Sequence, residues 1–260
     1  MTILIDCDYT VYKACASCET EIDFGDDVIV VTSLFSEVMK VIQRDIKAVS
    51  NCLGVFDDVI LFFSDSTNFR KEIDPAYKGH RNRKKPCGYR RAINALKEEY
   101  PVVVMPTLEA DDALGIHASR YPDAIIASPD KDMRQIPGRL YDLINPVVEI
   151  TKEEGDRWHL IQTMAGDQTD GYAGIPGIGI KRAEALLDAN GCCWQTVVNA
   201  FNEKGLDESV ALTNARLAKI LQADDYDFSL QCPRLWTPSP STGADNGATV
   251  QDETDRECAA

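Results

Sequence analysis

Three carboxylates lie within four residues in the stretch Leu108-Glu109-Ala110-Asp111-Asp112. Like charges this close repel one another, so an isolated cluster either takes up protons or spreads apart. A divalent cation removes that conflict, and ligands made only of oxygen suit Mg²⁺ or Mn²⁺. The same residues would also suit a solvated first turn of a helix, where acidic side chains are favoured. The stretch by itself leaves both interpretations open.

The pattern recurs, because four apolar runs each lead into acidic residues. The runs are residues 3–5, 59–63, 102–105 and 124–127, and the acids that follow them are Asp6, Asp65, Glu109, Asp130 and Asp132. Such short, β-branched runs separated by helical patterns predict strands of a parallel α/β sheet. Ligands bind these sheets beyond the carboxyl ends of the strands. Four acidic strand ends therefore predict one shared metal site.

Further elements of the first 150 residues follow from periodicity. Apolar residues at helical spacing predict a long amphipathic helix over residues 33–50, and further helices are expected over 9–18, 89–99 and 109–121. One or two edge strands are expected within 139–150, and the acidic stretch 19–27 is expected to be a loop. We therefore predict an α/β domain over residues 1–150, with a mostly parallel central sheet flanked by helices.

A basic run interrupts this domain. Residues 78–91, KGHRNRKKPCGYRR, contain seven Lys or Arg and no acid, although the chain as a whole carries a net charge of −15. A compact basic patch in an acidic protein predicts a polyanionic partner. A solvated basic loop is the alternative, but the nearby carboxylates favour handling of phosphate. The connection 70–91 is too long and polar for an ordinary loop between a strand and a helix.

The C-terminal part has a different character. A helix is expected over 153–165, followed by Asp167 and Asp170 and by a turn that contains Gly174, Gly177 and Gly179. A glycine-rich turn that opens a helix presents backbone N–H groups to phosphate, and Lys181 adds a positive charge there. We predict a helical DNA-binding region over 151–237. The composition of residues 238–260 predicts a disordered acidic tail.

Composition limits the compartment. The chain has no apolar run of about 18 residues and no signal-peptide pattern, so we expect no membrane partner and a cytoplasmic location. Nine cysteines form an odd count without a second CxxC or HxxxH motif, which makes reduced thiols more plausible than disulfides or a zinc site.

Five strings occur in a characteristic order: LIDCD, FFSDSTNFRKEIDPAYKGHR, LEADD, SPDKD and GDQTDGYAGIPGIG. This order resembles the 5′-nuclease superfamily, which includes flap endonucleases and the 5′-nuclease domain of bacterial DNA polymerase I. Over roughly residues 1–237 the chain looks in particular like the 5′→3′ exonucleases of T-seven-like bacteriophages. The resemblance implies a PIN-like 5′-nuclease fold with a C-terminal helix-hairpin-helix region and a basic arch at residues 70–91.

The resemblance also implies roles for individual residues. The metal-binding carboxylates would be Asp6, Asp65, Glu109, Asp111, Asp112, Asp130, Asp132, Asp167 and Asp170. Lys78 and Arg81 would act on the scissile phosphate, and Tyr77 would stack on the terminal base. Contacts to DNA would come from Tyr77, Lys78, Arg81, Arg83, Lys84, Lys85, Gly174, Gly177, Gly179 and Lys181. The glycine turn would resemble the helix-hairpin-helix that grips the duplex backbone, often with K⁺ on its carbonyls.

The implied reaction is metal-assisted hydrolysis of a phosphodiester by two Mg²⁺ ions about 3.5–4 Å apart, with Mn²⁺ as a substitute. Asp6, Asp65, Glu109 and Asp111 would serve the first ion. Asp130 and Asp132, with Asp167 or Asp170, would serve the second, and Asp112 would bridge or act through water. The expected activity is 5′→3′ exonuclease action on duplex DNA with 5′ ends, together with removal of RNA from RNA–DNA hybrids.

Such an enzyme would be a monomer that serves phage DNA replication, recombination or host DNA degradation in the host cytoplasm. A structure-specific flap endonuclease is the main alternative. A catalytically inactive nucleic-acid clamp would have lost carboxylates, and none is missing here. A haloacid-dehalogenase-like phosphatase could use Asp6-Cys7-Asp8 as its DxD motif, but the basic run and the glycine turn would have no role in it.

Overall fold

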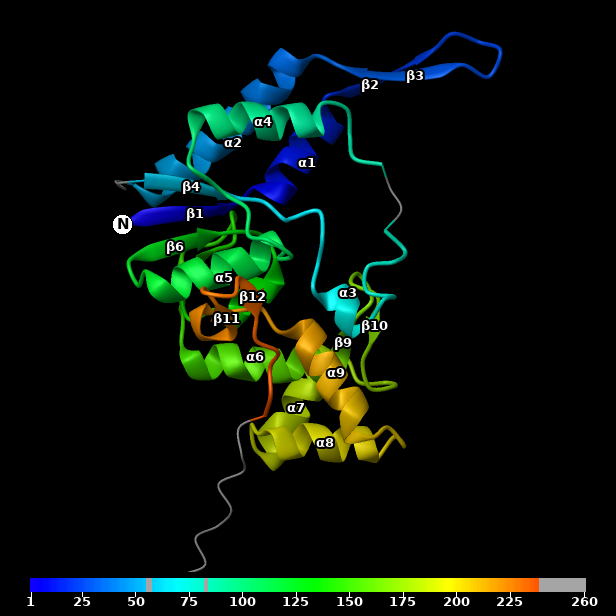
Figure 1. Cartoon of the computed structure of the whole chain (residues 1–260), viewed down its shortest axis with the longest axis vertical. Coiled ribbons are helices and arrows are strands. Elements are labelled where there is room, and N and C mark those ends of the chain that lie inside the picture. The colour runs from blue at the N-terminus through cyan, green and yellow to red at the C-terminus, as the bar shows by residue number, and fades with distance from the viewer. Residues whose placement is uncertain (55–57, 82–83, 239–260) are drawn as a thin grey trace, which may run out of the picture.

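The computed structural model describes residues 1–54, 58–81 and 84–238 (Figure 1). Its centre is a six-stranded sheet with the strand order β5-β4-β1-β6-β7-β8. The strands are β1 (Thr2–Asp6), β4 (Asp58–Phe62), β5 (Val102–Val103), β6 (Ala124–Ala127), β7 (Gly138–Tyr141) and β8 (Val148–Ile150). The first five pair in parallel and β8 runs antiparallel to β7, which confirms the predicted mostly parallel sheet.

Helices cover both faces of the sheet. On one face lie α1 (Cys7–Ser17), α2 (Phe35–Leu53) and α4 (Tyr89–Glu99), and on the other lies α5 (Ala110–Arg120) (Figure 1). The alternation of side chains along β1 explains this arrangement, since successive residues of a strand point to opposite faces. Ile3 and Ile5 pack into the core under α1, α2 and α4, whereas Leu4 packs into the core under α5.

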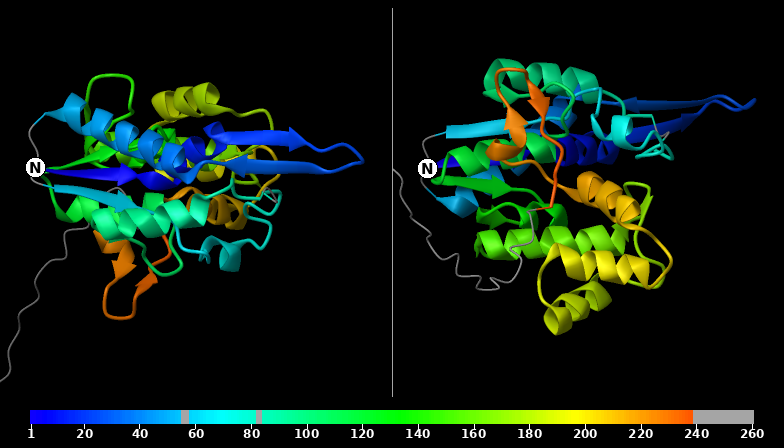
Figure 2. Two further views of the ribbon diagram at one scale, coloured as in Figure 1. Left: turned by 90° about the horizontal axis from the view of Figure 1, so that it is seen from above. Right: turned by 60° about the horizontal axis from the view of Figure 1, so that its bottom comes forward.

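The expected loop at residues 19–27 is instead part of a two-stranded hairpin. Strands β2 (Glu19–Asp23) and β3 (Ile29–Ser33) pair antiparallel, and the hairpin projects away from the body of the molecule (Figure 2). In β2, acidic residues flank Ile22, and they obscured the alternation of apolar and polar side chains that is typical of a strand. Ile22 pairs with Val30 across the hairpin. Stability of such a pair comes from cross-strand contacts, so one strand read alone gives a weak signal.

The C-terminal part forms a helical layer with its own core. It contains α6 (Lys152–Ala165), α7 (Ile180–Asn190), α8 (Trp194–Asn202) and α9 (Glu208–Ala218), with the short strands β9 (Gly166–Asp167) and β10 (Tyr172–Ala173) after α6. Buried residues of all four helices meet in one apolar cluster. The chain then returns to the α/β part through η2 (Ala223–Asp225), β11 (Tyr226–Asp227) and β12 (Cys232–Pro233). Residues 239–260, the expected acidic tail, lie outside the described residues.

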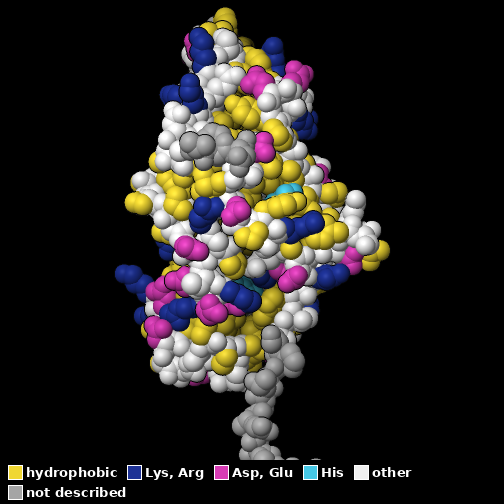
Figure 3. Space-filling model, turned by 90° about the vertical axis from the view of Figure 1, so that its left-hand side faces the viewer, with side chains coloured by type: hydrophobic (Ala, Val, Ile, Leu, Met, Phe, Trp, Pro, Cys, Tyr) yellow, Lys and Arg dark blue, Asp and Glu magenta, His cyan; other side chains and the backbone are white. Residues whose placement is uncertain are grey.

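The remaining short elements are α3 (Arg70–Ile73), at the start of the basic connection, and the 3₁₀ helix η1 (Lys131–Gln135), which follows β6. Among the described residues, no helix has the length and apolarity needed to cross a membrane. Figure 3 views the molecule from the side on which β1 begins, and charges of both signs are interspersed with apolar side chains there. The acidic residues singled out above lie on the opposite side of the molecule, at the carboxyl ends of the parallel strands.

Gly115 sets how closely the C-terminal segment approaches α5. A Cβ at this position would overlap the carbonyl oxygen of Leu221. We expect Gly115→Ala to lower the free energy of unfolding by about 1–3 kcal/mol or more, because neither the helix nor the backbone carbonyl can move freely. Urea denaturation measures the change.

Gly179→Ala is the matched control, since no atom lies within 4 Å of the Cβ that it would add. A smaller loss of about 1 kcal/mol or less is expected for it, because Gly179 is the N-cap of α7, where Ala is less favourable than Gly. Equal losses in the two variants would show that close packing of α5 against Leu221 is not the cause.

Candidate active site

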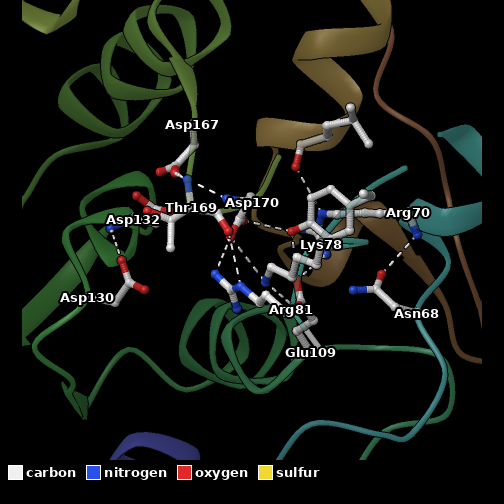
Figure 4. A network of polar contacts seen from close by, with 12 residues as sticks. Asn68, Arg70, Lys78, Arg81, Glu109, Asp130, Asp132, Asp167, Thr169 and Asp170 are labelled. Carbon is white, nitrogen blue, oxygen red and sulfur yellow. Dashed lines mark hydrogen bonds and ion pairs between the residues drawn. The ribbon is translucent and has the colours of Figure 1, made fainter. Parts of the chain in front are cut away.

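A cleft of about 1050 Å³ opens at the carboxyl ends of β1, β4 and β6. Eight of the nine carboxylates predicted for metal binding line it: Asp6, Asp65, Glu109, Asp111, Asp130, Asp132, Asp167 and Asp170. They come from five separate segments of the chain. The predicted convergence of acidic strand ends is therefore present in the structure, and the C-terminal layer adds a wall to it (Figure 4).

Backbone geometry places the carboxylates nearest the sheet. Asp6 is the last residue of β1 and the N-cap of α1, so it lies where the strand changes to a helix. Asp65 follows β4, and its carboxylate accepts hydrogen bonds from the backbone N–H of Ser66 (2.7 Å) and Thr107 (2.9 Å) and from the Thr67 hydroxyl (2.7 Å). These donors lower the pKa of Asp65 to about 2 and fix its orientation.

The start of α5 positions the LEADD motif. Glu109 is the N-cap of α5 and forms a capping box with Asp112. The Ala110 N–H donates to the Ser64 hydroxyl at 3.0 Å, which ties the helix start to the end of β4. Asp111, in the first turn, therefore faces the cleft beside Glu109.

The other wall combines residues from η1 and from the loop after α6. Asp130 caps η1 by accepting the N–H of Asp132 at 2.8 Å. Asp167 accepts the N–H groups of Thr169 (2.7 Å) and Asp170 (3.3 Å), so its carboxylate closes its own turn. Each acidic residue thus organises the short segment that presents it.

Crowding of the carboxylates shifts their protonation. Burial, followed by the charges of Asp8 and Asp130, raises the pKa of Asp6 to about 6. Burial and the charge of Asp130 raise the pKa of Asp132 to about 6. Burial together with Asp6, Asp130 and Glu109 raises the pKa of Asp111 well above its ordinary value. The site therefore holds more negative charge than its surroundings stabilise.

Lysine side chains relieve part of this charge. Nζ of Lys131 lies 2.7 Å from Asp167 and 3.6 Å from Asp132. Nζ of Lys78 donates to Glu109 and lies 3.5 Å from Asp170. Burial opposes ionisation of Glu109, but Lys78 and Arg70 outweigh it and lower the Glu109 pKa to about 2.

The residues fit a divalent cation on two grounds. Oδ1 of Asp6 is buried and has no hydrogen-bond partner, and the raised pKa values show that the cluster lacks positive charge. Within the part of the chain that the structure describes, no three Asp, Glu, His or Cys side chains are close enough to hold an ion as they stand. Mutual repulsion and the two lysines account for that separation.

Asp112 does not belong to the cleft, contrary to the prediction. Its side chain is fully buried, and its two oxygens accept from NH1 (2.6 Å) and NH2 (2.8 Å) of the equally buried Arg70. Arg70 also donates to the carbonyls of Leu217 (2.9 Å) and Lys219 (2.6 Å). Asp112 therefore holds α3, α5 and the segment after α9 together, because both carboxylate oxygens are committed to Arg70.

Tyr77 also differs from its expected role. Its side chain is 1% exposed, and its hydroxyl lies within hydrogen-bond distance of Glu109 (3.0 Å) and Asp170 (2.8 Å), so that its one proton is shared between the two carboxylates. In this arrangement the ring is not available to stack on a base. The next residue, Lys78, has a positive φ of 53°, and its N–H donates to Asp170 O at 2.7 Å. The strained backbone turns the Lys78 ammonium into the cleft.

The rest of the basic run divides into two groups. Arg81 and Lys85 line the cleft, and Arg81 NH2 lies 2.8 Å from Asp170. Lys84 is exposed outside the cleft, and Arg83 lies outside the described residues. The described part of the run therefore borders the cleft both near its start, at Lys78 and Arg81, and nearer its end, at Lys85 and Arg90.

The glycine turn lies apart from the cleft, between β10 and α7. Gly174 is required for packing, since a Cβ there would overlap the carbonyls of Met164 and Ala165 at the end of α6. Gly177 has a φ of +79°, and its carbonyl accepts from Arg182 at 2.6 Å. Gly179 is the N-cap of α7, and Lys181 is exposed in its first turn. The backbone of Gly179 has open space around it.

Similarity to known proteins identifies the family of this chain. Residues 1–162 match the family described as "5′-3′ exonuclease, N-terminal resolvase-like domain". The chain belongs to this family. It is 29% identical to the exodeoxyribonuclease of Enterobacteria phage T3, over 91% of this chain and 92% of that protein. It is 28% identical to the exonuclease of Escherichia phage T7, over 91% and 93% of the two chains.

The fold is also similar to that of a phage nuclease of known structure. A crystal structure of the bacteriophage T5 flap endonuclease with DNA and metal ions has a TM-score of 0.60 and 15% identity, and the match covers 84% of this chain and 89% of that one. These findings confirm the resemblance to the 5′-nuclease superfamily and the PIN-like fold. They make the chain a nuclease.

Several residues of the cleft were not predicted from the family's motifs. Lys131 lies between the two aspartates of SPDKD, and Tyr9 and Arg90 also line the cleft. Asp8 accepts from the Tyr89 hydroxyl (2.7 Å) and from the Ser64 N–H (2.9 Å), so it links α1 to α4 and to the end of β4. The position of Lys131 inside an acidic motif was the one available signal, since a cation there has carboxylates on both sides.

The adjacent residues Asp111 and Asp112 should respond oppositely to substitution. Asp112→Ala leaves the buried Arg70 guanidinium with only the 3.3 Å contact to Glu109 as an ion pair, and we expect it to cost about 3–5 kcal/mol of the free energy of unfolding. Asp111→Asn removes a repelled charge, so we expect a higher melting temperature in EDTA and a smaller rise when Mg²⁺ is added. Thermal melts with and without Mg²⁺ measure both effects. A lower melting temperature for both variants would mean that the two carboxylates share a structural role.

Proposed function

We propose that this nuclease is a metal-dependent 5′→3′ exonuclease that hydrolyses phosphodiester bonds at the 5′ ends of duplex DNA. The observation that carries the proposal is the meeting of nine carboxylates, the eight predicted ones and Asp8, with residues of a basic run in one cleft. The T3 and T7 relatives, which match over almost their whole length, are described as exodeoxyribonuclease and exonuclease. Their names support the choice of an exonuclease over other nucleases.

The carboxylates of the cleft would hold the metal, which we propose to be two Mg²⁺ ions, with Mn²⁺ as a substitute. Asp6, Asp65, Glu109 and Asp111 form one group near the sheet. Asp130 and Asp132, with Asp167 or Asp170, would serve the second ion. Such ions supply Lewis-acid stabilisation of a phosphodiester and activation of water. Asp112 has no part in this proposal, because Arg70 engages both of its oxygens.

Lys78 and Arg81 would bind the scissile phosphate. In the structure both cations are paired with carboxylates of the cleft, Lys78 with Glu109 and Arg81 with Asp170. A phosphate that enters beside them offers the same type of charged acceptor, so their ammonium and guanidinium groups can donate to it without large movement. Charge that develops on the phosphate is then neutralised by groups already aimed at the cleft.

The duplex would lie across the C-terminal layer. The backbone N–H groups of Gly177 and Gly179 and the side chain of Lys181 would contact its phosphates, and the carbonyls of the turn would bind K⁺. Gly174 would shape this turn through its packing on α6. Lys84, Lys85 and Arg83 would attract the strand that enters the cleft. Only an unpaired or frayed end can reach past them, because unstacking inside a duplex costs a few kcal/mol more.

Removal of RNA from RNA–DNA hybrids, a monomeric state and a role in phage DNA replication, recombination or host DNA degradation in the cytoplasm complete the proposal. A structure-specific flap endonuclease is the second candidate, because the T5 protein of similar fold is described as a flap endonuclease. The two candidates share the cleft and its chemistry and differ in the substrate that passes the basic run.

The direct test uses linear duplex DNA labelled at either end, a branched duplex with a 5′ flap, and covalently closed circles. With Mg²⁺, we expect short products from 5′ ends of the linear duplex, resistance of the closed circles and no products in EDTA. Preferential release of the whole flap would favour the flap endonuclease. Rapid loss of closed circles shown to be free of nicks would contradict any need for a 5′ end.

Lys78 and the pair Lys84 and Lys85 should affect different constants. We expect Lys78→Ala to lower kcat by about 10²–10³-fold, because it removes a donor positioned at the reacting phosphate. We expect the double variant Lys84→Ala and Lys85→Ala to raise the Kd for DNA and to reduce the salt dependence of binding, since it removes only phosphate contacts along the strand. Single-turnover rates and salt titrations separate the two effects. Equal losses of kcat in both variants would refute the distinction.

A further inference from the structure

A chain of two buried side-chain amides ends at Asp132, on the side of this residue that faces away from the cleft. Nε2 of Gln162, on α6, donates to Asp132 Oδ1 at 2.5 Å. Nε2 of Gln135, at the end of η1, donates to Gln162 Oε1 at 2.6 Å and to the Ala218 carbonyl at 2.6 Å. The exposed fractions are 3% for Gln162 and 1% for Gln135. Neither glutamine lines the cleft.

The backbone fixes the direction of every hydrogen bond in this chain. The Ile220 N–H donates to Gln135 Oε1 at 3.0 Å, so the Gln135 amide must present its Nε2 to Gln162. Gln162 accepts this donor through Oε1 and can present only its own Nε2 to Asp132. The Ile220 N–H, a backbone donor in the segment after α9, therefore determines that the Gln162 amide points its N–H, and not its carbonyl oxygen, toward Asp132.

Close packing of α6 against η1 fixes the positions of the two amides relative to Asp132. A Cβ at Gly155 of α6 would overlap the carbonyl oxygen of Gln135, so α6 and η1 are in close backbone contact. Asp132 itself belongs to η1, and its backbone N–H donates to Asp130. Among the described residues, the hydrogen bond from Gln162 and the ion pair with Lys131 both engage Oδ1 of Asp132. This leaves Oδ2 to coordinate a cation.

We infer that Gln162 is a positioning residue for the metal site, and that Gln135 orients it. Gln162 holds the Asp132 carboxylate by one oxygen so that the other faces the cation, and it does so without adding charge to the cleft. The inference rests on the proposed role of Asp132 in metal binding. Outer partners of metal ligands typically change metal affinity by about 10–100-fold when they are removed.

The test is Gln162→Met, which conserves the length of the side chain but removes both of its polar atoms. Binding of Mn²⁺ in the absence of DNA is followed by the electron paramagnetic resonance signal of the free ion. We expect the Mn²⁺ affinity of one of the two proposed sites to fall by about tenfold or more, and kcat to fall while the KM for DNA is unchanged. Mn²⁺ binding reports on the site independently of turnover.

Thr163→Val is the matched control. Thr163 is the next residue of α6, is fully buried, and its hydroxyl donates to the His159 carbonyl within the helix at 2.9 Å. This variant loses one buried hydrogen bond, whereas Gln162→Met loses two, and it should also lower the melting temperature without metal. We expect its Mn²⁺ affinity to remain at the wild-type value, which separates positioning from general loss of stability.

A double-mutant cycle with Asp132→Asn completes the test. If Gln162 acts through Asp132, Gln162→Met should have no further effect on Mn²⁺ affinity in the Asp132→Asn background. Equal effects of Gln162→Met in both backgrounds, or wild-type Mn²⁺ affinity for the single variant, would overturn the inference. Wild-type Mn²⁺ binding and hydrolysis by Asp132→Asn alone would instead overturn the proposed metal role of Asp132.

Discussion

Repulsion among the carboxylates that line the cleft is the constraint on which the rest of this structure depends. A cleft lined by so many acids resists folding unless cations approach it, and the raised pKa values of Asp6, Asp111 and Asp132 record the part of that repulsion that remains. Lys78 and Lys131 enter the cleft from separate segments and each pairs with two carboxylates. The protein thus keeps a site of high negative charge, which is the property that divalent cations require, while limiting its cost to stability.

The same constraint explains how the two layers of the molecule are joined. Half of the acidic wall comes from the sheet and the remainder from η1 and the C-terminal layer, so the layers must be held in fixed relation. Two buried polar connections do this at the segment 217–222. Arg70 binds Asp112 and the carbonyls of Leu217 and Lys219, and Gln135 binds Ala218 and Ile220. The first connection ends at Asp112, which is adjacent to Asp111 of the site. The second ends, through Gln162, at Asp132.

The motifs and the hydrophobic pattern predicted most of the site, because parallel strands bring their carboxyl ends to one edge. Asp6, Asp65, Glu109, Asp130 and Asp132 met in one cleft for that reason. The pattern could not separate Asp111 from Asp112, since both lie in the first turn of one helix. Which of the two faces the cleft depends on where Arg70, 42 residues earlier in the chain, is buried. Tyr77 was misassigned for a similar reason, because its burial depends on Glu109 and Asp170, which are distant in sequence.

The sequence by itself determined the fold class, the family and the identity of the acidic strand ends, because these depend on local periodicity and on motifs that are contiguous in the chain. Only the tertiary structure decided which carboxylates are available to a cation and which are committed to a buried partner. It also revealed the hairpin β2–β3, whose pairing joins two strands that are individually weak signals, and the amide chain from Ile220 to Asp132. Such decisions require distances between segments far apart in sequence, and the physical properties that follow from them, burial and charge, are defined only once the chain has folded.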